Sequence, residues 1–600
     1  MQMHDAIRQQ ILSLYQRQSF AEVVTIFSAN TSIRQCDPNT GLCVSNALRH
    51  TGQVVNAKKY FEVLIKRFPN VPAILNSYAN LLIASKNLDL AAKQLKQAIR
   101  IDERFCDAYI NLARLQTLQQ KHSLAIKTYH SAQRLRPNDI NIDIGLAVAH
   151  MSQGDPLTAE GIYQRLLTTA AGQSNLRVLV NYAGLLREKQ NYSDALGILK
   201  QALNYYPQSA LIQSMLAANF ALSKDMEQAA EHYQFALKME PSNTDIQIEF
   251  AHFRWAQGID QPFEPMIQAI NDPVVQYDLY IACVDLLLNA EQFGLVSQVL
   301  QLGYRVLKDD SSFNMFAARH ARLTGDLDAA ERYIAVALKQ SKRPVSVSIE
   351  NERGYIALAH RNAKLALSIY RNLQRREPDN QGWWTLYSTA LKLADRVEEY
   401  QTLCDYGLVY CASVLTEKPS NFLQDLTSKL EIVHANTNHP IGQSLRNGTQ
   451  TYEDIFDDSS PVIQELKSWI HQQATQFSQS LTTQKSHPFL CKSGQPISFT
   501  GSWSVCLRRG GYHTSHFHPQ GWLSGVFYVD VPKAVDTGGQ GWLRFGVPEI
   551  SQLELPADYC VKPSNGTLVL FPSFMWHGTQ AFEDGDRRMT IAFDMIPTKT

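Results

Sequence analysis

Alanine and large apolar residues recur at a nearly constant interval through the first part of the chain. Each alanine is followed four residues later by a large apolar residue and three residues after that by Leu or Ala. This spacing places all three positions on one face of an α-helix. The alanines stand 34 or 36 residues apart: Ala57, Ala91, Ala125, Ala159, Ala195 and Ala229.

Each interval also contains a second predicted helix, in which a large apolar residue stands directly before a small one. Small residues at fixed positions allow two antiparallel helices to approach closely, and large residues fill the space between them. Proline closes several units because it cannot continue a helix. The apolar and small pairs are Tyr78-Ala79, Leu112-Ala113, Leu146-Ala147, Tyr182-Ala183 and Leu216-Ala217, and the closing prolines are Pro69, Pro137, Pro207 and Pro241.

Helix pairs with a period of this length predict an all-α solenoid, and the columns resemble the tetratricopeptide repeat. We expect the solenoid over residues 1–420, regular to about 241, degenerate over 242–320 and regular again to about 380. The column residues are interpreted as buried packing positions, so a binding function would belong to the concave polar face.

The pattern changes from residue 495 onward, where the helical period ends and short β-rich runs alternate with Gly and Pro. Several short strands separated by turn signals favour a small sandwich or barrel. Helical crossovers are missing between them, which excludes parallel βαβ units. The predicted strands cover residues 497–507, 522–531, 541–545, 567–571 and 589–596.

Composition and charge narrow the possible functions. Lys plus Arg and Asp plus Glu both number 56, so the chain has no net positive field for a nucleic-acid partner. The sequence contains no run of about 18 apolar residues that would predict a membrane span, and the first 20 residues lack the apolar core of a signal peptide. The nine cysteines form no C-x-x-C pair, which favours reduced thiols and a cytoplasmic location.

Histidines are concentrated among the predicted strands. His516 and His518 flank Phe517, and alternate side chains of an extended chain share a face. His577 follows the predicted strand at 567–571. A metal bound by these three residues would have ligands on one face and open positions opposite, as in non-haem Fe(II) oxygenases.

A candidate anion-binding pair follows eleven residues after His577. Arg588 and Thr590 alternate onto one face of the last predicted strand. A guanidinium and a hydroxyl in this arrangement could together hold a carboxylate.

The order of these motifs carries a family resemblance. His516-x-His518, about 60 residues, Phe571-Pro572-Ser573 with Trp576-His577, and Arg588-x-Thr590 resemble the 2-oxoglutarate and Fe(II)-dependent oxygenases of the double-stranded β-helix fold, a cupin-like jelly roll. The chain is similar throughout to bacterial proteins that join tetratricopeptide repeats to such a domain. The stretch from His439 to Thr451 extends the resemblance upstream, which gives an oxygenase domain over 430–600 with a helical lead-in to about 480.

The resemblance implies Fe(II) and 2-oxoglutarate as cofactors. It implies His516, His518 and His577 as metal ligands and catalytic residues, and Arg588 and Thr590 as the 2-oxoglutarate site. One position departs from the family: most members have Asp or Glu where this chain has His518. Either His518 is the third ligand, or two histidines suffice and water completes the site, as in the aspartyl and asparaginyl β-hydroxylases.

Two functions remain open on the sequence. In the first, the chain is a dioxygenase that hydroxylates a protein or peptide side chain captured by the repeats. In the second, the repeats are a non-catalytic scaffold and the barrel is a degenerate metal-binding domain. His513 is interpreted as capping a turn. Asp530, Asp536, Glu549 and Glu554 are interpreted as solvated residues, with a missing carboxylate ligand among them as the alternative.

Overall fold

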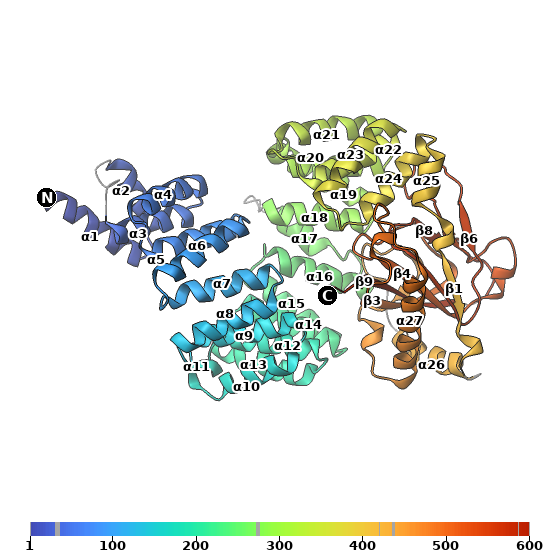
Figure 1. Ribbon diagram of the computed structural model, residues 1–600, viewed down its shortest axis with the longest axis horizontal. Coiled ribbons are helices and arrows are strands. Elements are labelled where there is room, and N and C mark those ends of the chain that lie inside the picture. The colour runs from blue at the N-terminus through green and yellow to red at the C-terminus, as the bar shows by residue number, and fades with distance from the viewer. Residues whose placement is uncertain are drawn as a thin grey trace. The chain divides into compact units, whose positions relative to one another are not determined.

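A computed structural model of the protein describes residues 2–30, 37–271, 277–418, 421–434, 439–585 and 587–598. The chain divides into two compact units, 1–239 and 240–600. The first is helical throughout its described residues, and the second continues with helices and ends in β-strands (Figure 1).

The first unit consists of antiparallel helix pairs. Local signals in the sequence fix where the helices start and stop. Asp155 caps α10 by accepting a hydrogen bond from the Thr158 amide, and Gly154 ends α9 in the left-handed conformation at φ 84°. The helices are α1 (Gln2–Gln16), α2 (Phe20–Ala29), α3 (Pro38–His50), α4 (Val54–Arg67), α5 (Pro72–Ala84), α6 (Leu88–Ile101), α7 (Cys106–Leu118), α8 (His122–Leu135), α9 (Ile140–Gln153), α10 (Pro156–Leu167), α11 (Ala170–Gln173), α12 (Leu176–Glu188), α13 (Tyr192–Tyr205), α14 (Ala210–Leu222) and α15 (Met226–Met239).

The repeated alanines lie where consecutive helices touch. All six are completely buried, and the large apolar residues that follow them are buried as well. This confirms the predicted repeat, because a larger side chain at an alanine position would separate the helices.

We expect Ala125→Leu to lower the free energy of unfolding by about 1 to 3 kcal/mol, because α8 has no space there for the added carbons. Chemical denaturation of the full chain measures this. Leu124→Ala on the same helix is the control, since Leu124 is exposed. A stability loss at Leu124 equal to that at Ala125 would contradict the repeat register.

The second unit begins with further helices of the solenoid. The stretch predicted to be degenerate contains the seven-residue helix α17, shorter than its neighbours. The helices are α16 (Thr244–Ala256), α17 (Glu264–Ile270), α18 (Tyr277–Asn289), α19 (Phe293–Leu307), α20 (Ser311–Leu323), α21 (Leu327–Gln340), α22 (Val347–Ala359), α23 (Ala363–Arg376), α24 (Gly382–Leu393) and α25 (Val397–Leu403).

The β-strands of the second unit form two antiparallel sheets. Within the described residues the larger sheet has the order β1-β7-β4-β9-β3-β2 and the smaller one β6-β5-β8. The strands are β1 (Tyr410–Ser413), β2 (Leu445–Gln450), β3 (Ile497–His513), β4 (Leu523–Asp530), β5 (Leu543–Phe545), β6 (Tyr559–Val561), β7 (Thr567–Pro572), β8 (His577–Thr579) and β9 (Arg587–Pro597).

These sheets confirm the predicted β-domain, which is consistent with a jelly-roll oxygenase domain, and they also correct its details. β3 continues to His513 instead of ending at Leu507, since β2 and β9 both pair with it. β1, β2, β6 and β8 are short strands that the sequence pattern did not predict. Two helices, α26 (Phe422–His434) and α27 (Pro461–Ser480), accompany the sheets, and Trp469 of α27 packs on Phe527 of β4.

One apolar core joins the last solenoid helices to the β-domain. Its buried residues run from Ala357 in α22 through Leu386 in α24 to Phe571 in β7. In the second unit, the last solenoid helices and the sheets therefore share one continuous apolar core. None of the described helices combines the length and apolar character needed to cross a bilayer.

Candidate metal centre

Three histidines meet between the two sheets. His516 and His577 form an antiparallel bridge, in which each backbone N–H donates to the other's carbonyl, at 2.8 and 2.9 Å. His518 is tied to the neighbouring turn by its N–H, which donates to the Ser573 carbonyl at 3.0 Å. One ring nitrogen from each histidine lies within 4.8 Å of the others.

The Nδ1 atom of every histidine in this cluster already has a partner. His516 Nδ1 lies 2.9 Å from the Thr514 carbonyl, and His577 Nδ1 lies 2.9 Å from the Met575 carbonyl. A carbonyl only accepts hydrogen bonds, so Nδ1 carries the proton in both rings and Nε2 carries the lone pair. Metal-binding histidines are held in this way by partners behind them.

Asp594 holds the third ring and was missed by the sequence analysis. Its carboxylate lies 2.6 Å from His518 Nδ1 and accepts a hydrogen bond from the Ser524 hydroxyl at 2.6 Å. Most family members have a carboxylate at position 518. In this chain the carboxylate belongs to Asp594 and lies behind the His518 ring. Asp594 shares the inward face of β9 with Arg588 and Thr590, and this alternation is the only signal that could have found it.

The four acidic residues proposed from the sequence as a missing ligand do not join the histidine cluster. Asp530 pairs with Arg587 at 2.7 Å, Asp536 pairs with Lys562 at 2.7 Å, and Glu549 accepts the Ser515 N–H at 3.1 Å. Glu554 is exposed. Among the described residues, the cluster is therefore composed of histidine alone.

Burial favours the uncharged form of two of the histidines. Desolvation, with a smaller contribution from neighbouring His518, lowers the pKa of His516 to about 3. Desolvation, with smaller contributions from His516 and His518, lowers the pKa of His577 well below its ordinary value. Neutral imidazoles are the ligands that divalent transition metals require, so the residues present fit Fe(II).

The Arg588 guanidinium is a buried positive charge. Its side chain is 2% exposed, its guanidinium lies 5.0 Å from the centre of the Tyr528 ring, and its Nε atom has no hydrogen-bond partner. No carboxylate of the described residues forms an ion pair with it, and burial lowers its pKa. A buried charge without a partner is costly, so this guanidinium fits a carboxylate ligand such as 2-oxoglutarate. Thr590 is also buried and faces the same cavity.

The histidines and Arg588 line one cavity of about 740 Å³. Solenoid residues form part of its wall, including Trp255 of α16, Asn289 at the end of α18 and Arg319 of α20. This volume lies within the range of small-molecule sites, and leaves space beside a metal and a cosubstrate.

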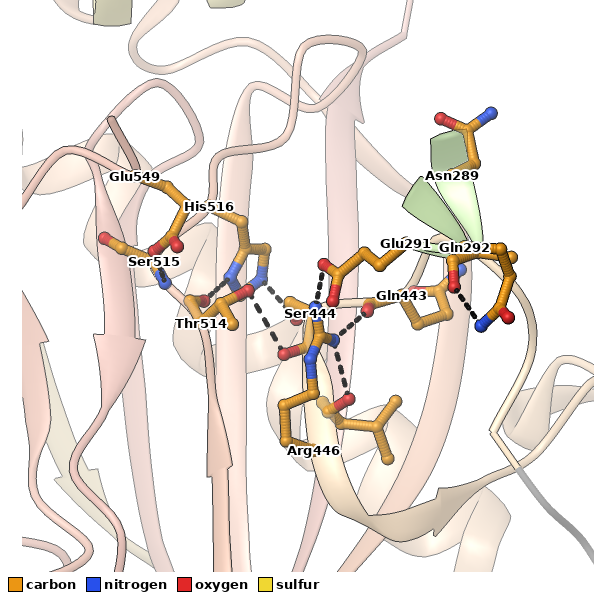
Figure 2. Close-up of polar contacts among 12 residues, drawn as sticks. Asn289, Glu291, Gln292, Gln443, Ser444, Arg446, Thr514, Ser515, His516 and Glu549 are labelled. Atoms are coloured by element: carbon orange, nitrogen blue, oxygen red, sulfur yellow. Dashed lines mark hydrogen bonds and ion pairs between the residues drawn. The ribbon is translucent and has the colours of Figure 1, made fainter. Parts of the chain in front are cut away.

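A short segment, Gln443–Arg446, joins the solenoid to the metal centre. Figure 2 shows Ser444 beside His516, where its hydroxyl lies 3.4 Å from Nε2, and the Arg446 guanidinium turned toward Glu291. Arg446 forms an ion pair with Glu291 and donates to the Gln443 carbonyl at 2.9 Å. Helices and strands therefore both contribute to the cavity wall.

The structure corrects the role predicted for His513. His513 does not cap a turn: it is the last residue of β3, and its Nδ1 lies 2.9 Å from the Ser444 hydroxyl. Its ring lies beside His516, with centroids 5.9 Å apart. Trp522 is a core residue, whereas Trp503 faces the cavity.

Comparison with known proteins assigns both parts of the chain. Residues 501–594 match the family described as "Putative 2OG-Fe(II) oxygenase", and residues 45–70 and 150–218 match tetratricopeptide repeat families. The type IV pilus assembly protein PilF of Pseudomonas aeruginosa is 28% identical over 148 residues, 24% of this chain. The chain spans 58% of the length of that curated relative.

Solved structures of repeat proteins are similar to the helical part. A tetratricopeptide repeat protein from Parabacteroides merdae is 12% identical, with a TM-score of 0.36 over 42% of this chain and 98% of that one. Pseudomonas aeruginosa PilF is 20% identical, with a TM-score of 0.24 over 42% of this chain and 97% of that one. By the family matches alone, the chain carries tetratricopeptide repeats in its N-terminal region and, at residues 501–594, a domain that matches the family described as "Putative 2OG-Fe(II) oxygenase".

Proposed function

We propose that the protein is an Fe(II)- and 2-oxoglutarate-dependent oxygenase that hydroxylates a protein or peptide side chain. The observation that carries the proposal is the pairing of two ligand-binding groups in one cavity. One is the set of three imidazoles, each held by a partner at Nδ1, and the other is the buried Arg588 guanidinium, whose Nε atom has no hydrogen-bond partner.

His516, His518 and His577 would hold the metal in this proposal. With Fe(II) and 2-oxoglutarate bound, dioxygen oxidises the cosubstrate to succinate and carbon dioxide, and one oxygen atom enters a C–H bond of the substrate. Three neutral ligands leave the full positive charge of the metal within the cavity. Asp594, behind His518, offsets part of that charge without occupying a metal position.

Arg588 and Thr590 would orient the cosubstrate. A planar guanidinium can donate two parallel hydrogen bonds to the far carboxylate of 2-oxoglutarate, and the Thr590 hydroxyl can donate a third. Both residues are buried, so this carboxylate would be held out of water.

The solenoid supports a polypeptide as substrate. Tetratricopeptide repeats form long concave surfaces that suit extended or helical peptides. Trp255, Asn289 and Arg319, which come from three solenoid helices, line the metal cavity itself. A side chain of a bound polypeptide could then enter the cavity while its backbone contacts the helices.

Two measurements on the full chain test the activity. Purified protein reloaded with Fe(II) should convert 2-oxoglutarate to succinate in the presence of dioxygen, and candidate polypeptides should gain one oxygen atom by mass spectrometry. A chain that binds stoichiometric Fe(II) and 2-oxoglutarate yet forms no succinate with or without substrate would favour the non-catalytic scaffold instead.

A further inference from the structure

Helix α24, near the end of the solenoid, contacts both segments that carry the histidines. The backbone N–H of Gln381, at the start of α24, donates to the Pro519 carbonyl at 2.9 Å. Four residues later the Thr385 hydroxyl donates to the Phe574 carbonyl at 2.5 Å. One helix therefore holds the chain directly after His518 and three residues before His577.

A second bond fixes the segment before His577 at another point. Trp576 Nε1 donates to the Thr389 hydroxyl at 2.9 Å, one helical turn beyond Thr385. Thr385, Thr389 and Trp576 are all buried, so these bonds do not compete with water. Met575, whose carbonyl orients the His577 ring, lies between the two anchored residues Phe574 and Trp576.

The other histidine segment is positioned through Phe517. Its ring packs edge-on against Trp576 with centroids 4.9 Å apart. Gly382 of α24 lies against the same ring, where an added Cβ atom would lie 2.6 Å from Phe517 Cε2. A larger residue at position 382 would therefore displace the ring.

We propose that α24 is a structural part of the metal centre, with Gly382, Thr385 and Thr389 acting as positioning residues for the three histidines. The inference deepens the proposed function, because it makes metal affinity and ligand geometry depend on the repeats. The solenoid would then set the geometry of the site in addition to contacting substrate.

The first test is Gly382→Ala in the full chain, with Fe(II) and Co(II) as probes. We expect the Fe(II) dissociation constant to rise about 10-fold, the lower end of the range for residues behind metal ligands. The Co(II) absorption spectrum, which reports ligand geometry, should also change. Gly294→Ala is the matched control: Gly294 stands near the start of α19, and an added Cβ there meets nothing within 4 Å.

Thr385 supplies a second test that adds no bulk. Thr385→Val removes the hydroxyl and leaves the buried Phe574 carbonyl unpaired, so Fe(II) affinity should fall about 10-fold. Thr385→Ser keeps the hydroxyl and should restore both the affinity and the Co(II) spectrum. Thr117→Val is the control, since the Thr117 hydroxyl donates only within its own helix, to the Ala113 carbonyl at 3.1 Å.

The outcomes separate this inference from the proposed function. A wild-type chain that binds no Fe(II) would overturn the proposed function and the inference with it. Wild-type binding accompanied by unchanged affinity and Co(II) spectra in both Gly382→Ala and Thr385→Val would overturn the inference alone. Thermal melting of the metal-free variants distinguishes a displaced ligand, which leaves the melting temperature unchanged, from a general loss of stability.

Discussion

His577→Ala should abolish stoichiometric Fe(II) binding and all 2-oxoglutarate turnover. The substitution removes one of the three proposed ligands, while the backbone bridge between residues 516 and 577 remains. Two imidazoles with no third protein ligand bind a divalent metal much more weakly. Metal analysis after dialysis against excess Fe(II), under anaerobic conditions, measures the loss.

His471→Ala is the control for that experiment. His471 also lies in the second unit, but its ring contacts the Ile497 carbonyl at 3.0 Å and is no member of the histidine cluster. Its substitution should leave the Fe(II) content unchanged. Undiminished stoichiometric iron in His577→Ala would refute the assignment of the metal centre.

His518 distinguishes the two forms of the site that the sequence left open. If His518 is a ligand, His518→Ala should lose iron, and His518→Asp should retain it by restoring the usual His-x-Asp pattern. Asp594 already stands behind this position, so Asp594→Asn should be combined with His518→Asp to remove the repulsion between two carboxylates. Retention of both iron and turnover in His518→Ala would instead support two histidines and water.

Arg588→Ala should weaken 2-oxoglutarate binding by about 2 to 5 kcal/mol, since a buried carboxylate would lose its charged partner. Arg588→Lys should also bind poorly, because a single ammonium cannot reproduce two parallel hydrogen bonds. Calorimetric titration of the metal-loaded protein measures both effects.

The adjacent arginine is the matched control. Arg587 points away from the cavity and pairs with Asp530 on β4 and Glu431 on α26. Arg587→Ala should keep the 2-oxoglutarate affinity of the wild-type chain. Equal losses at both positions would show that the effect arises from the strand as a whole, and wild-type affinity in Arg588→Ala would exclude its role as the anchor.

The repeats could be predicted because their helix packing requires the same residue types at a regular interval. The residue at each helix contact must be small, as Ala125 is. Alanine therefore recurs at a regular interval that can be found from the sequence alone. The histidines were predictable for a similar reason, since His516 and His518 keep the alternation of an extended chain. That segment is nevertheless not a continuous strand, because His516 forms only an isolated bridge.

Asp594 and α24 could not be predicted in the same way. Asp594 matters only because β9 places it opposite His518, and strand register is not visible in a single sequence. Thr385 looks like any helix threonine, and its partner Phe574 lies 189 residues away. Contacts between segments far apart in the chain produce no local sequence pattern. The residues that position the histidines could therefore not be predicted, whereas the histidines themselves could.

The contacts of α24 also determine when the metal centre can form during synthesis. Translation proceeds from the N-terminus, and domains fold in that order as they emerge. Helix α24 is therefore complete long before either histidine segment is made, and it can receive each segment in turn. The first segment brings two histidines, but the third follows about 60 residues later. Iron loading is thus expected to be a late event in the maturation of each new chain, after both histidine segments have joined the apolar core that α24 shares with the sheets.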